Sequence, residues 1–535
     1  MSNADLVRLR EDVCVDPLIN GWYAWAFLLS PAAASFVQTR NVGRVEGLLQ
    51  RVEQIKDLMV GSHLMATSLP EISGDEASQI HEALDRHSAS TEAATALRNA
   101  ILAVDGLLAK MNGGPLTPFY RDVPDILKGA VELVYDRYHR PGFFLHERVL
   151  YEDGWMNRQS QTMRLYGPQV KRRPAFLLPR FSQSDVFDID LPFTHAGYDV
   201  LFRSRYQPTP FEHVCAALNV DQQRAAMLRP LFEETETASS EIPCDMVTPP
   251  AAKIFRYFGH ASILASINGK TFLTDPWIPA FSTTAEDATY GLRDLPQHID
   301  YVIISHAHAD HLNVETLLEL RHRVGHVYVP RGAGRSVNDP SMKVMIESLG
   351  FERVQEVDYF EDINLGDVTL TALPFFGEHG DLDVTAKASY LLSTRDFRCA
   401  FLSDSKNIVP ELYDRLAARL HGGVDLVFVG MECEGAPVNW LYEPVLTSRV
   451  PQRLATSRRL AASDCSEASD LAARLDASQV AIYAMGYERS LAYLIGKTST
   501  DDDWSHQEAR RFIAQCNTSS RRATLMRGRM EMVFP

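Results

Sequence analysis

A short segment of the chain contains four side chains that commonly bind metal ions. The segment "SHAHADHLN" (305–313) places His306, His308, Asp310 and His311 within six positions, directly after an apolar run. His306 and His308 are two positions apart, so in an extended segment both project to the same side. A lone histidine is usually solvated or part of a core, but that role does not account for four potential ligand residues in this order. The segment therefore predicts a site for two neighbouring metal ions.

The elements around this segment predict an α/β fold. "YVIIS" is typical of a short buried strand, and "NVETLLELRHRV" predicts an amphipathic helix with Asn313 as its N-cap. Further strands are expected at "HVYVP", "VTLTALPF", "FRCAFLSD" and "VDLVFVG", and Asn268-Gly269 indicates a hairpin turn. The polar clusters lie at strand ends, where irregular backbone can present ligands.

The N-terminal half has a different pattern. Residues from about 40 to 112 have helical periodicity, residues 140–205 contain short β-like pieces, and helices return near 210 and 222. The segment 234–252 is polar and rich in Ser, Thr and Pro, which indicates a linker. We therefore expect a mixed α+β N-terminal domain over 1–245 and a catalytic domain over 246–535.

Composition limits the possible environment and partners. The formal net charge is −16, so a general nucleic-acid-binding role is not expected. The seven cysteines are scattered and never in a C-x-x-C pair, which fits reduced thiols in the cytoplasm. The N-terminal segment lacks the apolar core of a signal peptide, and "LINGWYAWAFLLSPAAASFV" is interrupted by Pro31. We expect a buried helix ending near Pro31 rather than a membrane span.

Two motifs resemble a known superfamily. "SHAHADHL" matches the signature of the metallo-β-lactamase superfamily, and "RYFGHASILASINGKTFLTDPWI" resembles the opening strands of its fold. This resemblance implies a C-terminal αββα sandwich. It also implies a third histidine, a bridging aspartate and a last histidine as further ligands. His260 in "FGHAS" is similar to an early histidine of related hydrolases, and we expect it to support the site rather than bind metal directly.

The chain departs from the superfamily pattern at two of these ligands. In the third-ligand region Glu378 stands where a histidine is expected, and the adjacent His379 is the competing candidate. Asp404 occupies the place of the bridging carboxylate. The last histidine is missing, because only His421 and His506 follow Asp404 and neither has a suitable position.

These departures favour iron over zinc. Carboxylates in place of imidazoles harden the site and add negative charge, as dioxygen-activating iron sites require. The acidic Glu432 and Glu434 also follow a strand, and the sequence does not show which of them approaches the metals. The main alternative is a dinuclear zinc hydrolase of the same fold, acting on a lactone, thioester or phosphodiester.

The narrower pattern resembles the non-heme diiron β-hydroxylases of nonribosomal peptide pathways, a branch that includes the β-hydroxylase of chloramphenicol biosynthesis. "GWYAWAFLLSPAAASF" and "MECEGAPVNWLYEP" are similar to segments of that branch. The resemblance implies two iron ions per chain, joined by an oxygen-derived bridge. It assigns one iron to His306, His308 and Glu378, the other to Asp310 and His311, and the bridging position to Asp404. Glu378 and Asp404 are the implied catalytic residues.

The same resemblance implies the reaction and the partners. The reaction would be hydroxylation at Cβ of an amino acid, aromatic by the chloramphenicol resemblance, held as a thioester on a peptidyl carrier domain of a nonribosomal peptide synthetase for antibiotic biosynthesis. O2 would be the co-substrate, and an external electron donor, such as a reductase, would be required. The N-terminal domain would serve dimerisation and carrier docking by analogy with that branch.

Three other features remain open from the sequence alone. The basic segments 170–180 and 449–461 would suit docking of an acidic carrier domain with a phosphate on its arm, or they are solvated or internally paired. Trp440 and Tyr442 could line a substrate cleft, although large aromatic residues more often belong to a core.

Overall fold

Two seven-stranded sheets form the centre of the C-terminal part of the chain. The computed structural model describes residues 5–58, 74–170, 172–176, 178–181, 183, 185–235, 252–278, 289–332, 336–496, 499–518 and 520–535. The first sheet has the order β15-β14-β13-β12-β11-β10-β25. Its strands are β10 (Lys253–Gly259), β11 (Ser262–Ile267), β12 (Lys270–Thr274), β13 (Ile299–Ile303), β14 (Val324–Pro330), β15 (Val354–Val357) and β25 (Met530–Phe534).

The second sheet packs face to face on the first. It has the order β16-β17-β18-β19-β20-β23-β24. The strands are β16 (Asp362–Asn364), β17 (Thr369–Leu373), β18 (Ser389–Ser393), β19 (Arg398–Phe401), β20 (Leu426–Gly430), β23 (Gln479–Tyr483) and β24 (Arg522–Leu525). Residues of both sheets, including Phe255, Phe272 and Phe428, form one buried apolar core, because alternate side chains of each strand face the other sheet.

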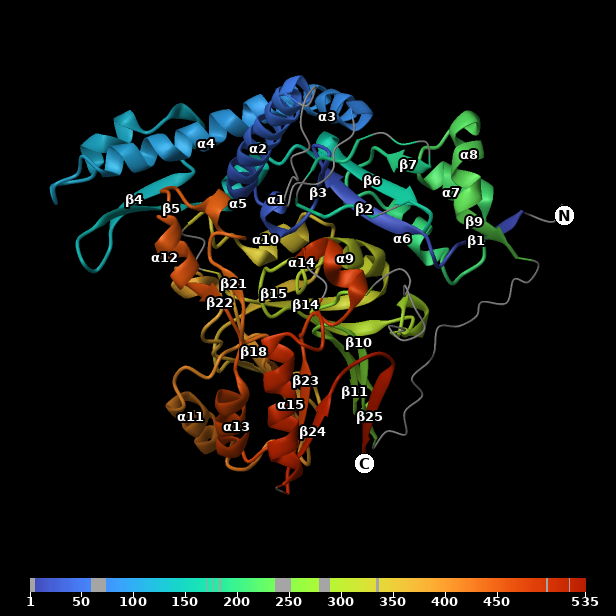
Figure 1. The fold of residues 1–535 in the computed structure, drawn as a ribbon, viewed down its shortest axis with the longest axis vertical. Helices are drawn as coiled ribbons and strands as arrows, with labels where there is room; N and C mark the ends of the chain where they lie inside the picture. The colour runs from blue at the N-terminus through green and yellow to red at the C-terminus, as the bar shows by residue number, and fades with distance from the viewer. Residues whose placement is uncertain are drawn as a thin grey trace.

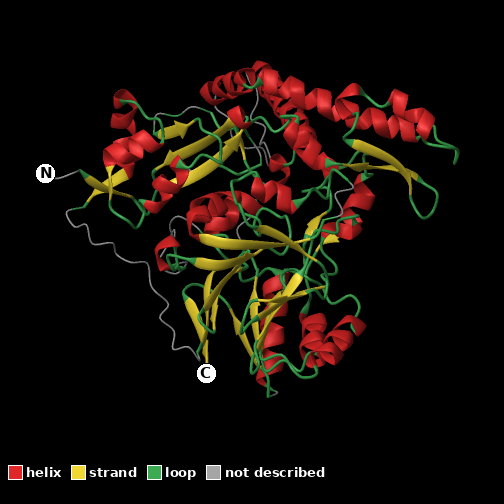
Figure 2. Cartoon of the chain, turned by 180° about the vertical axis from the view of Figure 1, so that it is seen from behind, coloured by secondary structure: helices red, strands yellow, loops and turns green. Residues whose placement is uncertain are grey.

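Helices cover the outer faces of both sheets, which gives the αββα arrangement (Figure 2). The helices α11 (Glu411–Leu420), α13 (Cys465–Arg474) and α15 (Trp504–Asn517) pack on the second sheet through a separate apolar cluster. The helices α9 (Val314–Leu320) and α10 (Met342–Glu347) lie on the first. This confirms the predicted metallo-β-lactamase sandwich. Asn313 caps α9, and Asn268-Gly269 forms the β11–β12 turn, with both residues at positive φ.

The N-terminal part lies above the sandwich in Figure 1 and is mixed α+β, as predicted. It contains a four-stranded sheet of order β3-β2-β6-β7, a three-stranded sheet of order β8-β1-β9 and the hairpin β4-β5. These strands are β1 (Leu6–Leu9), β2 (Cys14–Ile19), β3 (Trp22–Tyr23), β4 (Val131–Tyr135), β5 (Pro141–Leu145), β6 (Gln161–Tyr166), β7 (Val186–Ile189), β8 (Thr209–Pro210) and β9 (Phe232–Glu234). The main helices are α1 (Ala26–Leu29), α2 (Pro31–Leu58), α3 (Gly74–Arg86), α4 (Ser88–Leu108), α5 (Glu147–Glu152), α6 (Gly197–Arg203), α7 (Phe211–Ala217) and α8 (Gln222–Leu228).

A buried helix does end just before Pro31, as predicted, but it is much shorter than the apolar run. The segment before Pro31 forms β2, β3 and the four-residue helix α1, and the long helix α2 begins at Pro31. Proline suits the first position of a helix because its missing N–H has no intrahelical partner there. Within the described residues no helix is long and apolar enough to cross a membrane.

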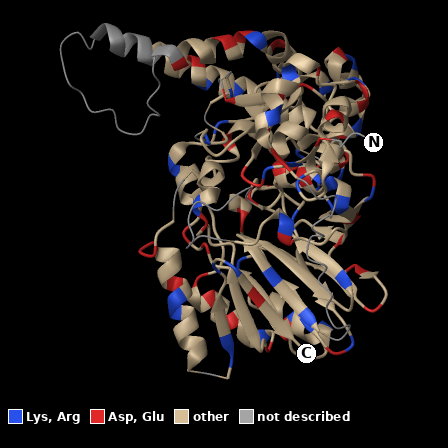
Figure 3. Ribbon diagram, turned by 90° about the vertical axis from the view of Figure 1, so that its right-hand side faces the viewer, with Lys and Arg blue, Asp and Glu red and all other residues tan. Residues whose placement is uncertain are grey.

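The two parts of the chain share a continuous apolar core. Residues of α1, α2, β6 and α6 belong to the same buried cluster as residues of α9 and α10. Buried ion pairs add to this interface: Arg205 Nε lies 2.7 Å from Glu319 Oε2 on α9. The expected boundary at 245/246 lies outside the described residues. Acidic and basic residues are interspersed along both parts (Figure 3).

Candidate metal centre

The candidate ligands converge because several strands end at the same edge of the sandwich. His306 follows β13, Glu378 follows β17 and Asp404 follows β19. β12 and β13 run parallel to each other, and β17 and β19 have the same direction because β18 is antiparallel to both. Carboxyl ends of strands with one direction meet at one edge, where loops can present ligands. All six predicted site residues lie at this edge.

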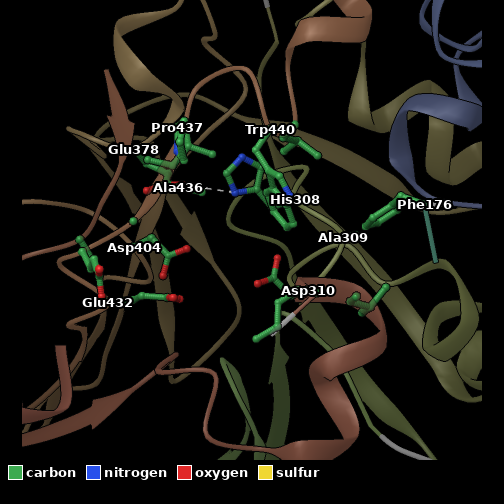
Figure 4. A pocket seen from close by; sticks show the side chains of 18 of the residues that line it. Phe176, His308, Ala309, Asp310, Glu378, Asp404, Glu432, Ala436, Pro437 and Trp440 are labelled. Atoms are coloured by element: carbon green, nitrogen blue, oxygen red, sulfur yellow. Dashed lines mark ion pairs between the residues drawn. The ribbon is translucent and has the colours of Figure 1, made fainter. Parts of the chain in front are cut away.

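These residues surround the floor of a cavity of about 600 Å³. Its lining includes His308, Asp310, Glu378 and Asp404, together with apolar residues from other segments. In Figure 4 the carboxylates of Asp310 and Asp404 point toward the same central space, which His308 also borders. His306 and His311 are fully buried beside this lining.

The first ligand cluster contains His306, His308 and Asp404, whose candidate ligand atoms lie within 4.8 Å of one another. His306 Nε2 is 3.6 Å from Asp404 Oδ2. Glu378 belongs to the same side, because its Oε1 lies 3.4 Å from His308 Nδ1 (Figure 4). His306 Nε2 is buried and has no hydrogen-bond partner among the described residues, which is unusual for a polar atom. A metal ion fits this cluster, since it would satisfy that atom.

The second cluster contains His260, Asp310 and His311. His260 Nε2 lies 3.1 Å from Asp310 Oδ2 and 3.3 Å from His311 Nε2. His311 Nε2 is in turn 3.0 Å from Asp404 Oδ2. Asp404 thus stands between the two clusters, as a bridging carboxylate requires. His260 was expected to support the site from behind the ligands, but its Nε2 lies among the candidate ligand atoms of this cluster.

Asp275 supports the second cluster from behind. His311 Nδ1 lies 2.9 Å from Asp275 Oδ2, and the Ser305 backbone N–H and hydroxyl both donate to Asp275 at 2.6 Å. A carboxylate on the far nitrogen of an imidazole fixes the ring and leaves its other nitrogen for a metal. Asp275 is not among the residues predicted from the sequence; its only signal there is its place in "TDP", at the end of an early strand.

Tyr442 supports the first cluster in a comparable way. Its hydroxyl lies 3.1 Å from His308 Nε2 and also hydrogen-bonds His379 Nδ1. His379 Nε2 is buried without a partner in the described part of the chain. Tyr442 is therefore part of the support of the site. Trp440 does border the cavity, with 51% of its surface exposed.

Burial and crowding set the protonation of the ligands. Burial lowers the pKa of His308 to about 4, and burial together with neighbouring imidazoles holds the pKa of His306 well below its usual value. Burial opposes ionisation of Asp310, but His311 and His260 lower the pKa of that carboxyl overall. Burial and the nearby Asp404 raise the pKa of Glu378 well above its usual value. Burial opposes protonation of His311, but Asp404 and Asp310 raise the pKa of that imidazole well above its usual value. Neutral imidazoles at His306 and His308 beside crowded carboxylates are suited to a hard cation.

The other residues considered as possible metal ligands lie away from the two ligand clusters or in the wall of the cavity. His421 ends α11 in a left-handed conformation, and the His506 ring stacks on Tyr487 with ring centroids 3.8 Å apart. Neither residue is among those that line the cavity. Glu432 is half-buried in the cavity wall, whereas Glu434 is exposed.

Comparisons with known proteins agree with this arrangement. Residues 8–236 match the family described as the diiron non-heme β-hydroxylase N-terminal domain, and residues 270–488 match a β-lactamase superfamily domain. The chain is 33% identical over 516 residues to the 4-amino-L-phenylalanyl-[CmlP-peptidyl-carrier-protein] 3-hydroxylase of Streptomyces venezuelae, covering 93% of each chain.

Solved structures give the same relation. The crystal structure of CmlA, a diiron β-hydroxylase from Streptomyces venezuelae, superposes with a TM-score of 0.88 at 29% identity, covering 99% of this chain and 100% of that one. A variant of CmlA superposes with a TM-score of 0.86 at 29% identity, covering 98% and 99%. The chain therefore belongs to the diiron non-heme β-hydroxylase family.

Proposed function

We propose that this protein uses O2 to hydroxylate Cβ of an amino acid that is held as a thioester on a peptidyl carrier domain. The observation that carries the proposal is the 33% identity, over 93% of both chains, to a relative named as a 3-hydroxylase of a carrier-bound 4-aminophenylalanyl group. One oxygen atom of O2 would enter the Cβ–H bond and the other would leave as water. This balance needs two electrons and two protons from an external donor, and a reductase is the proposed partner.

The proposed ligands are the six residues at the cavity floor. His306, His308 and Glu378 would hold one iron, Asp310 and His311 the other, and Asp404 would bridge them. Two irons bound there would supply open positions and electrons for O2 chemistry, which redox-inert zinc cannot supply. The distances from Asp404 Oδ2 to His306 Nε2 (3.6 Å) and His311 Nε2 (3.0 Å) support its bridging place.

The hydrogen bonds of Tyr442 support Glu378 over His379 as the ligand. Burial, and then Glu378, raise the pKa of Tyr442 well above 10, so the phenol stays neutral and has one proton to donate. If His308 Nδ1 is free for metal, His308 Nε2 donates to the phenol, the phenol donates to His379 Nδ1, and His379 Nε2 carries a proton.

A site in which His308 and His379 both bind metal is less favourable. Each imidazole would then keep one nitrogen without a proton for the metal, and the N–H of its other nitrogen would donate to the Tyr442 oxygen. The phenol proton would then lack an acceptor among the hydrogen bonds that this hydroxyl makes within the described residues, at a cost of about 1–3 kcal/mol. Metal binding by His308 therefore disfavours metal binding by His379. We propose His306, His308 and Glu378 as the ligands of this iron.

The cavity above the clusters suits an amino acid with a large apolar side chain. Phe176, Trp440, Leu460 and Ile495 contribute to its walls, and its carboxylates gather at the floor. An aromatic side chain would pack on such walls and exclude water from the reacting carbon. We therefore propose an aromatic amino acid as the substrate.

Other parts of the proposal rest on the family and on the sequence. The division into an N-terminal domain over 1–245 and a catalytic domain over 246–535 fits the two matched ranges, 8–236 and 270–488. Dimerisation through the N-terminal domain remains part of the proposal. The cysteines of the described residues are free and buried, which fits a cytoplasmic location.

The test is turnover of a carrier-loaded substrate. Iron-loaded protein, a chemical reductant and O2 should convert a 4-aminophenylalanyl thioester on a carrier protein to a product with one added oxygen atom at Cβ, detected by mass spectrometry. The free amino acid should not react. Hydrolysis of the thioester without oxygen insertion would instead establish the zinc-hydrolase alternative, and equal turnover of both substrates would defeat the carrier requirement.

A further inference from the structure

The arginines of the basic segment 170–180 are used inside the protein. Arg172 ion-pairs with Glu315 on α9 and lies 3.3 Å from Asp16. Arg180 Nε lies 2.8 Å from Asp16 Oδ2, with both side chains almost fully buried. These charges are compensated and join the N-terminal part to the sandwich. Arg172 and Arg180 therefore have a structural role and are not available to a partner.

Three of the four arginines of the segment 449–461 have the opposite arrangement. Arg449, Arg453 and Arg459 are exposed, and none of them has a carboxylate partner within the described ranges. The only bond of the Arg459 side chain to a protein group there is a 3.4 Å contact with the Gly435 carbonyl oxygen. The fourth, Arg458, is half-buried and donates from Nε to the Gly380 carbonyl oxygen at 2.7 Å. On a chain with a formal net charge of −16, the three exposed arginines form a local group of uncompensated positive charges.

The segment that carries these arginines runs beside the cavity, although the arginines themselves are not among its lining residues. The two-residue strands β21 (Ala436–Pro437) and β22 (Arg459–Leu460) pair with each other, and Ala436, Pro437 and Leu460 line the cavity. The helix α12 (Gln452–Ser457) contacts β21 and lies beside this pair in Figure 1. Arg459 thus directly precedes a wall residue of the cavity that contains Glu378 and Asp404, and α12, which carries Arg453, packs on the strand that forms another part of that wall.

Exposed apolar side chains accompany the charges. Trp440 borders the cavity with 51% of its surface exposed (Figure 4), and Leu454 on α12 is 46% exposed. Arginine beside exposed tryptophan and leucine is a composition found at protein interfaces, where apolar anchors are surrounded by polar groups.

We propose that Arg449, Arg453, Arg459, Trp440 and Leu454, together the rim surface, bind the carrier domain that delivers the substrate. This inference rests on the proposed function. The arm of a carrier domain bears a phosphate and its protein surface is commonly acidic, so both match unpaired guanidinium groups. Docking at the rim surface places the entry of the arm next to the cavity wall, and the thioester then extends toward the ligand clusters.

The experiment measures carrier binding apart from turnover. Arg453→Glu and Arg459→Glu are compared with Arg395→Glu, a matched reversal at an exposed position in the β18–β19 turn, at the opposite end of β19 from Asp404. The probe is the CmlP peptidyl-carrier protein with its phosphopantetheine arm, followed by fluorescence anisotropy. Loss of one charge-assisted contact should weaken binding about tenfold or more in the two rim variants. The control should stay within about twofold, and affinity of the wild type should fall as salt rises.

A second measurement separates docking from chemistry. A 4-aminophenylalanyl thioester of pantetheine, which lacks both phosphate and carrier, should be hydroxylated equally by the wild type and Arg453→Glu. Carrier binding by both rim variants as tight as that of the wild type, equal weakening in Arg395→Glu, or no binding by the wild type would overturn the inference. A wild type that binds the carrier but hydroxylates neither substrate would refute the proposed function and leave docking in place.

Discussion

Replacing Tyr442 by phenylalanine removes one hydroxyl that two imidazoles share. The ring volume is conserved, so packing against the neighbouring Phe27 ring, with a centroid distance of 5.9 Å, should persist. What is lost is the partner of His308 Nε2, at 3.1 Å, and of His379 Nδ1. Both nitrogens lie in buried residues, and an unsatisfied buried group costs about 1–3 kcal/mol.

The loss should appear in metal affinity as well as in stability. In the proposed site Tyr442 holds the His308 ring with Nδ1 toward iron, and removing such a supporting hydrogen bond typically lowers metal affinity about 10–100-fold. That range corresponds to about 1.4–2.7 kcal/mol, close to the cost of one unsatisfied nitrogen. The assay is iron retention against a chelator of known affinity, alongside urea unfolding of the metal-free protein.

A matched control isolates the role of the site. Tyr198 is fully buried in the N-terminal part, and its hydroxyl donates to the Leu191 carbonyl oxygen at 2.9 Å. Tyr198→Phe should lower stability by about 1–3 kcal/mol and leave iron affinity unchanged. Iron affinity of Tyr442→Phe within twofold of the wild type, or equal loss in Tyr198→Phe, would refute the supporting role.

Three further predictions concern other buried groups. Glu378→Gln should lose about half of the bound iron, measured by metal analysis after dialysis, whereas His379→Gln should keep it; the reverse order would overturn the ligand choice. Asp275→Asn should weaken iron binding about 10–100-fold in chelator competition, and an unchanged affinity would contradict its support of the second cluster. Burial raises the pKa of Glu315 to about 7 in the folded state, compared with an ordinary value of 4.5. At a pH between these two values, the folded state keeps a proton on Glu315 that the unfolded state has released. This contribution to stability is lost as pH rises from about 5 to 7, so the wild type should lose stability relative to Glu315→Gln across that window in urea unfolding; parallel curves would contradict it.

The ligand segment could be predicted from the sequence because its residues are close together and follow a buried strand. His306 and His308 share one side of an extended segment, and this local geometry is sufficient to expect a site. The supporting residues could not be found in this way. Asp275 meets His311, and Tyr442 meets His308, only after distant segments have packed.

The choice between Glu378 and His379 shows a different limit. Adjacent residues in a regular strand point to opposite sides, but Glu378 precedes a turn in which His379, Gly380 and Asp381 all have positive φ. Which of the two side chains enters the cavity depends on that irregular backbone. The alternation of side chains in a regular strand does not apply there, so the sequence pattern does not predict it.

The two basic segments show the limit of composition. Segments 170–180 and 449–461 have similar content, yet Arg172 and Arg180 of the first are compensated in the interior, whereas three of the four arginines of the second are exposed. Burial depends on the packing of the whole chain, so only the structure separates an ion-pair network from a surface. The helix expected before Pro31 is shorter than the apolar run for a related reason, because most of that run packs as a strand pair and only its last turn is helical.

If the six residues at the cavity floor form an iron site for oxygen chemistry, the metal content and optical spectrum of the purified, active protein should show it. We expect about two irons per chain and an oxo-bridged near-ultraviolet band that bleaches on reduction and returns with O2. Stoichiometric zinc without iron in active protein, with no such band, would contradict it.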